Sequence, residues 1–278
     1  MIARSRTFRI GATLALATAR IAVTSRLWAH DFWLVPGAFP FAEGATLEVR
    51  GQTSTRFPTS ESPVALARIA RAFSVGPDGE TPITDLTHQG TSLLVRHRPT
   101  SAGQRIVAVD LQARSARQPA AGLLRYLRLE GGADAADRIE REGLLRGVDS
   151  VTRTDTKYAK TLVEVGERGP RVFARSGGQV LEFIPEQDPK ELRGGDTLRL
   201  HLMFRGRLLP EFSGMAGRAP TDSAARAEPD VHLVAQDGVL RLPIALTGLW
   251  NIRTIYVVRL GPDAWETHWA TFVFRAGR

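Results

Sequence analysis

Apolar and polar residues alternate in many short segments of the chain, and Gly, Pro and Asp separate these segments. Between positions 198 and 204, for example, apolar residues at the even positions alternate with Arg199, His201 and Met203. A period of two is typical of a strand that buries one face and leaves the other wetter. The same pattern predicts strands at 46–50, 92–97, 105–111, 161–165, 180–184, 198–204, 231–235, 250–260 and 268–274.

The stretch from 120 to 145 departs from this period, because its leucines recur at helical spacing on both sides of Gly131 and Gly132. It predicts two short amphipathic helices, and the charges on them, Glu130 included, are expected on a solvated face. The pair Asp237-Gly238 predicts a tight turn and a hairpin after the strand at 231–235, since Gly tolerates positive φ. The polar, Ala-rich stretch 215–229 predicts a long loop.

These elements together predict a mainly β fold. A turn that runs into a strand occurs at 43–49 and again at 194–200, which suggests two similar modules. The glycines that follow Ser176 mark a boundary between them. We therefore expect two β-sandwich modules, Ig-like or prealbumin-like, with a short helical insertion in the first. The N-terminal β domain would cover 30–176 and the C-terminal β-sandwich domain 177–278.

The first 29 residues have the composition of a secretory signal peptide. Arg4, Arg6 and Arg9 precede an apolar run, and Ala29 is a small residue before a plausible cleavage point. The net charge of +8 at first suggests a nucleic-acid partner, but five of these charges are leader arginines, and the remaining chain carries +3. We expect a mature periplasmic chain that begins at His30 and has no nucleic-acid partner.

The chain has no cysteine, which excludes disulfide-linked partners, thiolate metal sites and cysteine nucleophiles. A metal ion would have to use nitrogen and oxygen ligands, and imidazole nitrogen suits nickel, cobalt, copper or zinc. The sequence also lacks Gly-x-Ser-x-Gly, a phosphate-binding loop and a dinucleotide fingerprint in a βαβ context. We therefore do not expect an enzyme.

Four separated segments of the chain resemble the DUF4198 family: 29–36, 157–166, 181–185 together with 195–198, and 248–253 followed by 263–272. They occur in the expected order and cover nearly the whole mature chain. The resemblance implies a periplasmic protein, and some relatives accompany nickel or cobalt importers of the energy-coupling type. Many relatives carry a histidine soon after the Gly-x-Trp segment, where this chain has Tyr256. A site that uses that histidine in relatives is therefore altered or absent here.

The candidate metal site starts at the predicted mature N-terminus. Cleavage before His30 would place an α-amine and an imidazole on one residue, and both can lose their protons to a metal ion near neutral pH. Asp31 could add a carboxylate or orient a ligand. His268 is the remote candidate, in the last predicted strand near Trp265, and Glu266 is expected on the other face of that strand.

Each of these residues also has a purely structural interpretation. His268 could pack at the edge of the core, and His30 could be an ordinary residue at a processing site. The aromatic residues of the predicted strands are expected in the core rather than on a sugar-binding surface. These aromatic residues are Phe32, Trp33, Trp250, Trp265 and Trp269.

The leading hypothesis is a non-enzymatic periplasmic protein that binds Ni²⁺ or Co²⁺ and passes it to a membrane metal importer, with Cu²⁺ or Zn²⁺ as alternative ions. A carbohydrate- or protein-binding β-sandwich without metal is a second hypothesis. A third is a copper-dependent oxidase that uses the His30 chelate with Tyr256 nearby.

Overall fold

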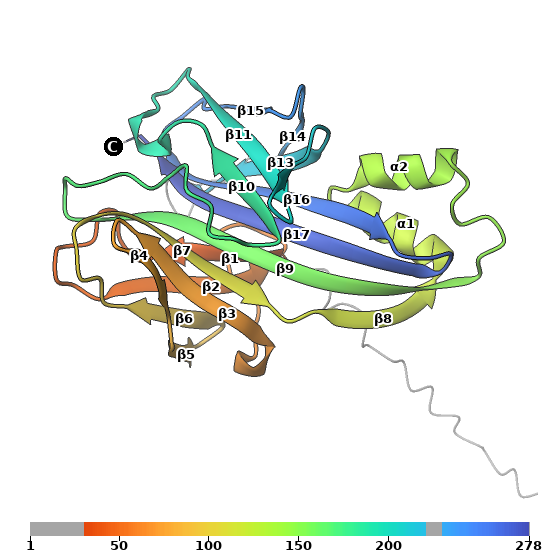
Figure 1. Ribbon diagram of the computed structural model, residues 1–278, viewed down its shortest axis with the longest axis horizontal. Helices are drawn as coiled ribbons and strands as arrows, with labels where there is room; N and C mark the ends of the chain where they lie inside the picture. The colour runs from red at the N-terminus through yellow and green to blue at the C-terminus, as the bar shows by residue number, and fades with distance from the viewer. Residues whose placement is uncertain (1–30, 221–229, 278) are drawn as a thin grey trace, which may run out of the picture.

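The computed structural model describes residues 31–220 and 230–277, and they form three β-sheets and a helical hairpin (Figure 1). Sheet A has the strand order β1 (Asp31–Pro36), β2 (Leu47–Ser54), β6 (Ser92–His97), β5 (Asp85–Gln89). Sheet C contains β10 (Leu181–Pro185), β11 (Thr197–Phe204), β12 (Arg207–Leu208) and, paired with β11, β15 (Leu240–Pro243).

Sheet B is the large sheet that both other sheets cover. Its strand order is β14 (Val231–Val234), β13 (Ser213–Arg218), β16 (Gly248–Arg259), β17 (Ala264–Ala276), β9 (Ser150–Val165), β7 (Gly103–Leu111), β3 (Ile69–Gly76), β4 (Gly79–Pro82). A further strand, β8 (Arg114–Pro119), pairs with β9. The pairing of β9 with β17 is parallel, whereas the other pairings in this sheet are antiparallel.

Both faces of sheet B are apolar, which explains why it lies between two other layers. Along β7, Ile106 and Ala108 belong to the core shared with sheet C. Val107 and Val109 belong instead to the core shared with sheet A. Because successive side chains of a strand point to opposite faces, one strand supplies both cores. The mainly β fold with sandwich layers, expected from the sequence, is confirmed.

The helical hairpin consists of α1 (Ala120–Leu129) and α2 (Ala133–Arg141), as the spacing of leucines predicted. Leu123 and Leu127 of α1 pack against Trp265 and Trp269 of β17 in a third core. The two helices lie near one end of the long strands β9 and β17, while sheet A lies near the other end of β9 (Figure 1). No helix within residues 31–220 and 230–277 is long and apolar enough to cross a membrane.

Two sequence predictions need correction: the hairpin around Asp237 and Gly238, and the long loop at 215–229. The tight turn at Asp237 and Gly238 is confirmed by their positive φ angles of 53° and 75°. The predicted hairpin is confirmed only at its turn, where Gln236 and Val239 form an antiparallel bridge, because beyond it β14 pairs with β13 in sheet B whereas β15 pairs with β11 in sheet C. The predicted loop at 215–229 is wrong at its start, because residues 215–218 belong to β13. Residues 221–229 lie outside the described part of the chain.

The predicted domain boundary near residue 176 falls in the connection between β9 and β10. Sheet B takes strands from both sides of this point, since β17 lies beside β9 along ten paired positions, from Ala264–Thr152 to Val273–Thr161. The two halves of the sequence therefore share one central sheet.

Candidate functional site

A buried carboxylate marks the start of β1. Asp31 is 4% exposed, and its Oδ2 lies 3.0 Å from Nε of Arg253 in β16. The same guanidinium binds a second carboxylate, with Nη1 2.5 Å from Oδ2 of Asp230. Burial alone would lower the pKa of Arg253, but the charges of Asp31 and Asp230 raise it. The first described residue of the chain is thus fixed to the central sheet by an ion pair.

Glu130, directly after α1, faces this ion pair from the helical side. Gly131 has φ 84°, and a Cβ atom there would lie 2.6 Å from Sδ of Met215, so glycine lets the end of α1 approach β13 closely. Burial, and to a lesser extent the charge of Asp31, raise the pKa of Glu130 to about 7 against the opposing charge of Lys157. The carboxyl group of Glu130 is therefore poorly solvated in its ionised form.

Lys157 of β9 completes this group of charges. Its Nζ lies 4.9 Å from the centroid of the Trp269 ring, and burial lowers the pKa of its ammonium group. We refer to Asp31, Glu130, Lys157, Asp230 and Arg253 as the N-terminal cluster. The cluster contains three carboxyl groups and two cations, so its net charge is −1 when all five groups are ionised.

The raised pKa of Glu130 has a measurable consequence. Its folded pKa of about 7 lies above the ordinary value of 4.5, so the folded protein binds the extra proton, and stability falls as pH rises from about 4.5 to 7. We expect Glu130→Gln to raise the free energy of unfolding of the metal-free protein at pH 7.5 by on the order of 2 kcal/mol. At pH 4.5 the difference should vanish. Urea unfolding at both pH values measures it, and an equal difference at both would contradict the assignment.

The described residues alone do not form a complete metal site. Within residues 31–220 and 230–277, no group of three or more His, Asp and Glu side chains could hold a metal ion. His30, the first predicted ligand, lies outside the described residues. Glu130 nevertheless suits a cation, because a metal ion in place of its proton would stabilise an ionised carboxylate that burial disfavours.

His268, the second predicted ligand, belongs to another environment. It is 5% exposed, with Nδ1 3.3 Å from the hydroxyl of Tyr158 and Nε2 3.1 Å from Oε2 of Glu266. Burial lowers its pKa. The expectation that Glu266 lies on the other face of the strand is wrong, because residues two apart in a strand share a face.

The structure does not bring Asp31 and His268 together. The hydroxyl of Thr271 donates to the carbonyl oxygen of Phe32 at 2.6 Å, so β1 lies on the face of β17 formed by odd-numbered residues. His268 is on the even-numbered face, in ring contact with Phe204 of sheet C. Central sheet B therefore separates the two predicted ligands.

The other two candidates are also accounted for. The ring of Tyr256 contacts that of Phe204 at a tilt of 51°, with the ring centroids 4.7 Å apart, so Tyr256 lies on the side of sheet C. Trp265 is 2% exposed and packs under α1, beside Arg153 of β9. Neither residue belongs to the N-terminal cluster.

One histidine passed over in the sequence does lie on the same face as the cluster. Met215 pairs with Arg253 on one side and with His232 on the other, so the three residues form one row across β14, β13 and β16. Paired residues point to the same face of a sheet. The alternation around His232 gave no sign of this, because only the pairing of β13 with both neighbours shows it.

The tryptophans do not build a sugar-binding surface in the described part of the chain. Trp33, Trp250, Trp265 and Trp269 are all 5% exposed or less, and Phe32 is 2% exposed. The prediction that these aromatic residues form the core is confirmed.

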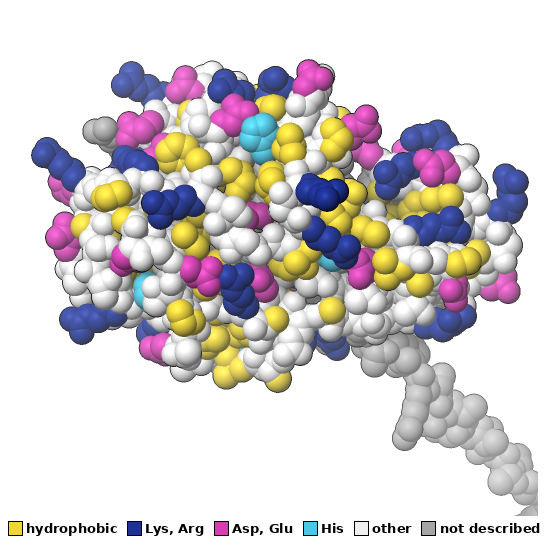
Figure 2. Space-filling view, in the orientation of Figure 1, with side chains coloured by type: hydrophobic (Ala, Val, Ile, Leu, Met, Phe, Trp, Pro, Cys, Tyr) yellow, Lys and Arg dark blue, Asp and Glu magenta, His cyan; other side chains and the backbone are white. Residues whose placement is uncertain are grey.

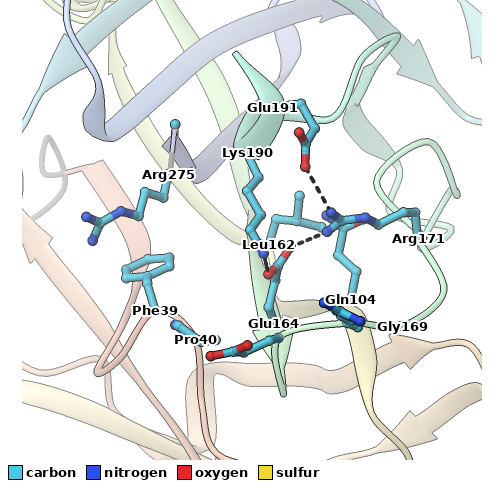
Figure 3. Close-up of a pocket in the computed structure, with 13 residues that line it drawn as sticks. Phe39, Pro40, Gln104, Leu162, Glu164, Gly169, Arg171, Lys190, Glu191 and Arg275 are labelled. Atoms are coloured by element: carbon cyan, nitrogen blue, oxygen red, sulfur yellow. Dashed lines mark hydrogen bonds and ion pairs between the residues drawn. The ribbon is translucent and has the colours of Figure 1, made fainter. Parts of the chain in front are cut away.

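A pocket of about 720 Å³ lies away from the N-terminal cluster, between the loop after β1, the end of β9 and the end of β17. Lys190 and Arg171 converge on the carboxylate of Glu164, and Nη2 of Arg171 lies 3.1 Å from Glu191 (Figure 3). Arg275 points away from this network (Figure 3). Because the charges of the network pair with one another, the pocket shows no strong preference for an anion or a cation.

The outer surface likewise carries no large field of one sign on the side shown in Figure 2. Lys and Arg side chains are interspersed there with Asp and Glu.

Comparisons with solved structures found distant likenesses. A structure of FdeC, an Escherichia coli adhesin, is 15% identical with a TM-score of 0.25, and the match covers 90% of this chain and 65% of that one. A DUF4785 family protein from Legionella pneumophila is 10% identical with a TM-score of 0.25, covering 79% and 50%. The chain thus spans between half and two thirds of these structures, and such values do not indicate a shared function.

No curated protein sequence matches the chain. A family model described as a domain of unknown function, DUF4198, matches residues 27–258, which is most of the chain. The chain belongs to the DUF4198 family.

Proposed function

We propose that the protein is exported to the periplasm, that its leader is removed after Ala29, and that the mature chain binds Ni²⁺ or Co²⁺ as cargo without catalysing a reaction. The observation that carries the proposal is the fixed position of Asp31. This residue follows directly after His30, is buried, and is held by Arg253 next to a second desolvated carboxyl group. The N-terminal cluster therefore includes the residue that directly follows the proposed cleavage point.

A mature N-terminal His30 would supply two nitrogen ligands from one residue. The α-amine has an ordinary pKa of about 7.7–8.0 and the imidazole of about 6.5, so a metal ion displaces both protons at modest cost near neutral pH. Amine and imidazole nitrogens suit late first-row divalent ions such as Ni²⁺ and Co²⁺. Because the α-amine exists only after cleavage, export and binding would be coupled.

Glu130 is the carboxylate that we assign as a further ligand. Its pKa is raised to about 7, so the carboxylate holds a proton near neutral pH, and a metal ion can replace that proton. Because Asp31 forms an ion pair with Arg253, we assign it the role of orienting His30 rather than of binding the ion. His268 and Tyr256 take no part in this proposal, since they lie on the side of sheet C.

Transfer of the ion to a membrane metal importer would fit the relatives that accompany nickel or cobalt uptake. In a chelate at a chain terminus, one residue supplies two ligands, and other coordination positions of the metal ion remain open to ligands from a partner. Such a site can release its ion to a competing set of ligands.

The protein purified from the periplasmic fraction of the producing bacterium tests export and cleavage together. We expect an intact mass that corresponds to residues 30–278, and about one nickel or cobalt ion per chain by elemental analysis after growth with the metal. A protein that retains its leader, or that is cleaved at another bond, would contradict the proposal. A correctly cleaved protein without metal, even after incubation with Ni²⁺, would contradict the metal assignment while leaving export in place.

A further inference from the structure

The pocket of about 720 Å³ is built by segments that are far apart in the sequence. Phe39 comes from the loop after β1, Glu164 from the end of β9, Lys190 from the 3₁₀ helix η3 (Pro189–Glu191), and Arg275 from the end of β17. The volume lies within the range of about 300–1,000 Å³ that is typical of sites for small organic molecules. The pocket is therefore large enough for a ligand bigger than a single ion.

The ion-pair network forms one side of this pocket. Arg171 and Lys190 both bind the carboxylate of Glu164, and Nε of Arg171 lies 3.3 Å from Oδ2 of Asp188. Arg275 lies on the other side of the pocket, above Phe39 (Figure 3). Because the groups of the network bind one another, a charged ligand would be recognised by other side chains of the pocket.

Three charged side chains of the lining stand outside this network. Glu167, Arg168 and Arg275 are exposed and form no ion pair with any described residue. One anion and two cations are thus available to a ligand. The lining as a whole holds four cations and three carboxylates, and Asp188, which binds Arg171, adds a fourth carboxylate. Balanced charge with available groups of both signs favours a ligand that also carries both signs.

The position of Arg275 next to an aromatic ring narrows the chemistry of the ligand. The guanidinium carbon of Arg275 lies 5.7 Å from the centroid of the Phe39 ring. Leu162, which is 7% exposed, adds an aliphatic surface to the lining. A guanidinium beside an apolar wall can bind a carboxylate and an apolar side chain of one residue together. The C-terminal residue of a peptide presents these two groups side by side.

We propose that this pocket binds a short peptide with free termini and an apolar C-terminal side chain. Arg275 binds the terminal carboxylate through its planar pair of N–H donors, Phe39 packs against the side chain, and Glu167 pairs with the terminal ammonium group. A free apolar amino acid carries the same three groups, so the test includes both. The residues involved are distinct from the N-terminal cluster, and the inference does not depend on metal binding.

Isothermal titration of the purified protein at low ionic strength tests the proposal, with the dipeptide alanyl-phenylalanine as the probe. We expect saturable binding to one site per chain. The same dipeptide with an acetylated N-terminus, and with an amidated C-terminus, should each bind about fivefold or more weakly, because each modification removes one charge. Free phenylalanine should bind more weakly than the dipeptide. The reverse order would overturn the assignment to a peptide in favour of a free amino acid.

Variants that remove one charge connect each terminus of the peptide to its partner. Arg275→Gln should weaken binding of the unmodified dipeptide about fivefold or more and leave that of the amidated form unchanged, since the amidated form has no carboxylate. Glu167→Gln should likewise weaken binding of the unmodified dipeptide but not of the acetylated form. Arg117→Gln, at an exposed arginine of β8, is the matched control and should leave every affinity unchanged.

Arg275→Lys separates charge from geometry, because it keeps the positive charge without the planar pair of donors, and it should retain part of the affinity. Thermal unfolding checks that each variant remains folded. The proposal is overturned if the dipeptide does not bind saturably, or if both modified dipeptides bind as tightly as the unmodified one. It is also overturned if Arg275→Gln weakens binding of the amidated form as much as that of the unmodified form.

Discussion

Replacing Glu182 with glutamine is expected to lower the free energy of unfolding by about 3–5 kcal/mol, because it leaves the ammonium group of Lys160 buried without its counter-charge. The two groups lie 2.9 Å apart, and both side chains are at most 2% exposed. Burial alone would raise the pKa of Glu182, but Lys160, the backbone N–H of Gly177 and the hydroxyl of Ser176 together lower it. The pair joins β9 of sheet B to β10 of sheet C.

The matched control replaces both partners. The double variant Lys160→Met with Glu182→Leu removes the two charges together, and buried ion pairs replaced in this way often leave stability nearly unchanged. We expect urea unfolding to show a large loss for Glu182→Gln alone and most of that loss recovered in the double variant. Equal losses in the two variants would mean that shape at this position, rather than charge, limits stability.

The strand pattern predicted the fold well wherever one face of a strand is apolar. In β11, Leu198, Leu200 and Leu202 are fully buried as alternation requires. The first half of β9 was missed, because its buried face carries Arg153 and Asp155 instead of apolar residues. These charges are buried by the helical hairpin and by each other, and no local sequence pattern reveals such a partner.

The candidate site could be predicted only in part, for a similar reason. Asp31 was found because it follows the predicted cleavage point, and this requires no knowledge of the fold. Glu130 was expected on a solvated helix face, but it is half-buried where the end of α1 approaches β13, so that expectation is wrong for this residue. Arg253 gave no signal, because its partners Asp31 and Asp230 both lie far from it in the sequence.

The separation of Asp31 from His268 illustrates a limit of strand periodicity. Alternation shows which residues of β17 share a face, but it does not show which face another strand covers. That β1 lies over Thr271 rather than over His268 depends on how sheet A packs on sheet B. This packing is set by apolar residues spread over several strands, among them Val107 and Val109 of β7.

Blocking the N-terminal nitrogen of the mature chain is expected to produce the largest functional effect. A chain with one extra residue before His30 keeps every side chain but converts the α-amine of His30 into an amide, which loses its proton to a metal ion far less readily. We expect its affinity for Ni²⁺ to fall about 100-fold or more, because the two-nitrogen chelate is lost. Glu130→Gln should weaken binding about tenfold or more in the unblocked chain, since it removes an oxygen ligand.

Two histidine variants serve as controls for this effect. His201 lies on the outer side of sheet C and contacts Glu186, so His201→Gln should leave Ni²⁺ binding unchanged. His268→Gln should also leave the affinity unchanged, because sheet B separates it from Asp31. A strong loss of affinity in His268→Gln, with the protein still folded, would show that the ion binds on the side of sheet C.

Calorimetric titration of Ni²⁺ into the chain that begins at His30, and into the same chain with one added N-terminal residue, tests the central claim most directly. We expect one tight site in the first protein, with protons released on binding, and at most weak binding in the second. Equal affinity in the two proteins, or no binding in either, would contradict the assignment of the ion to the mature N-terminus.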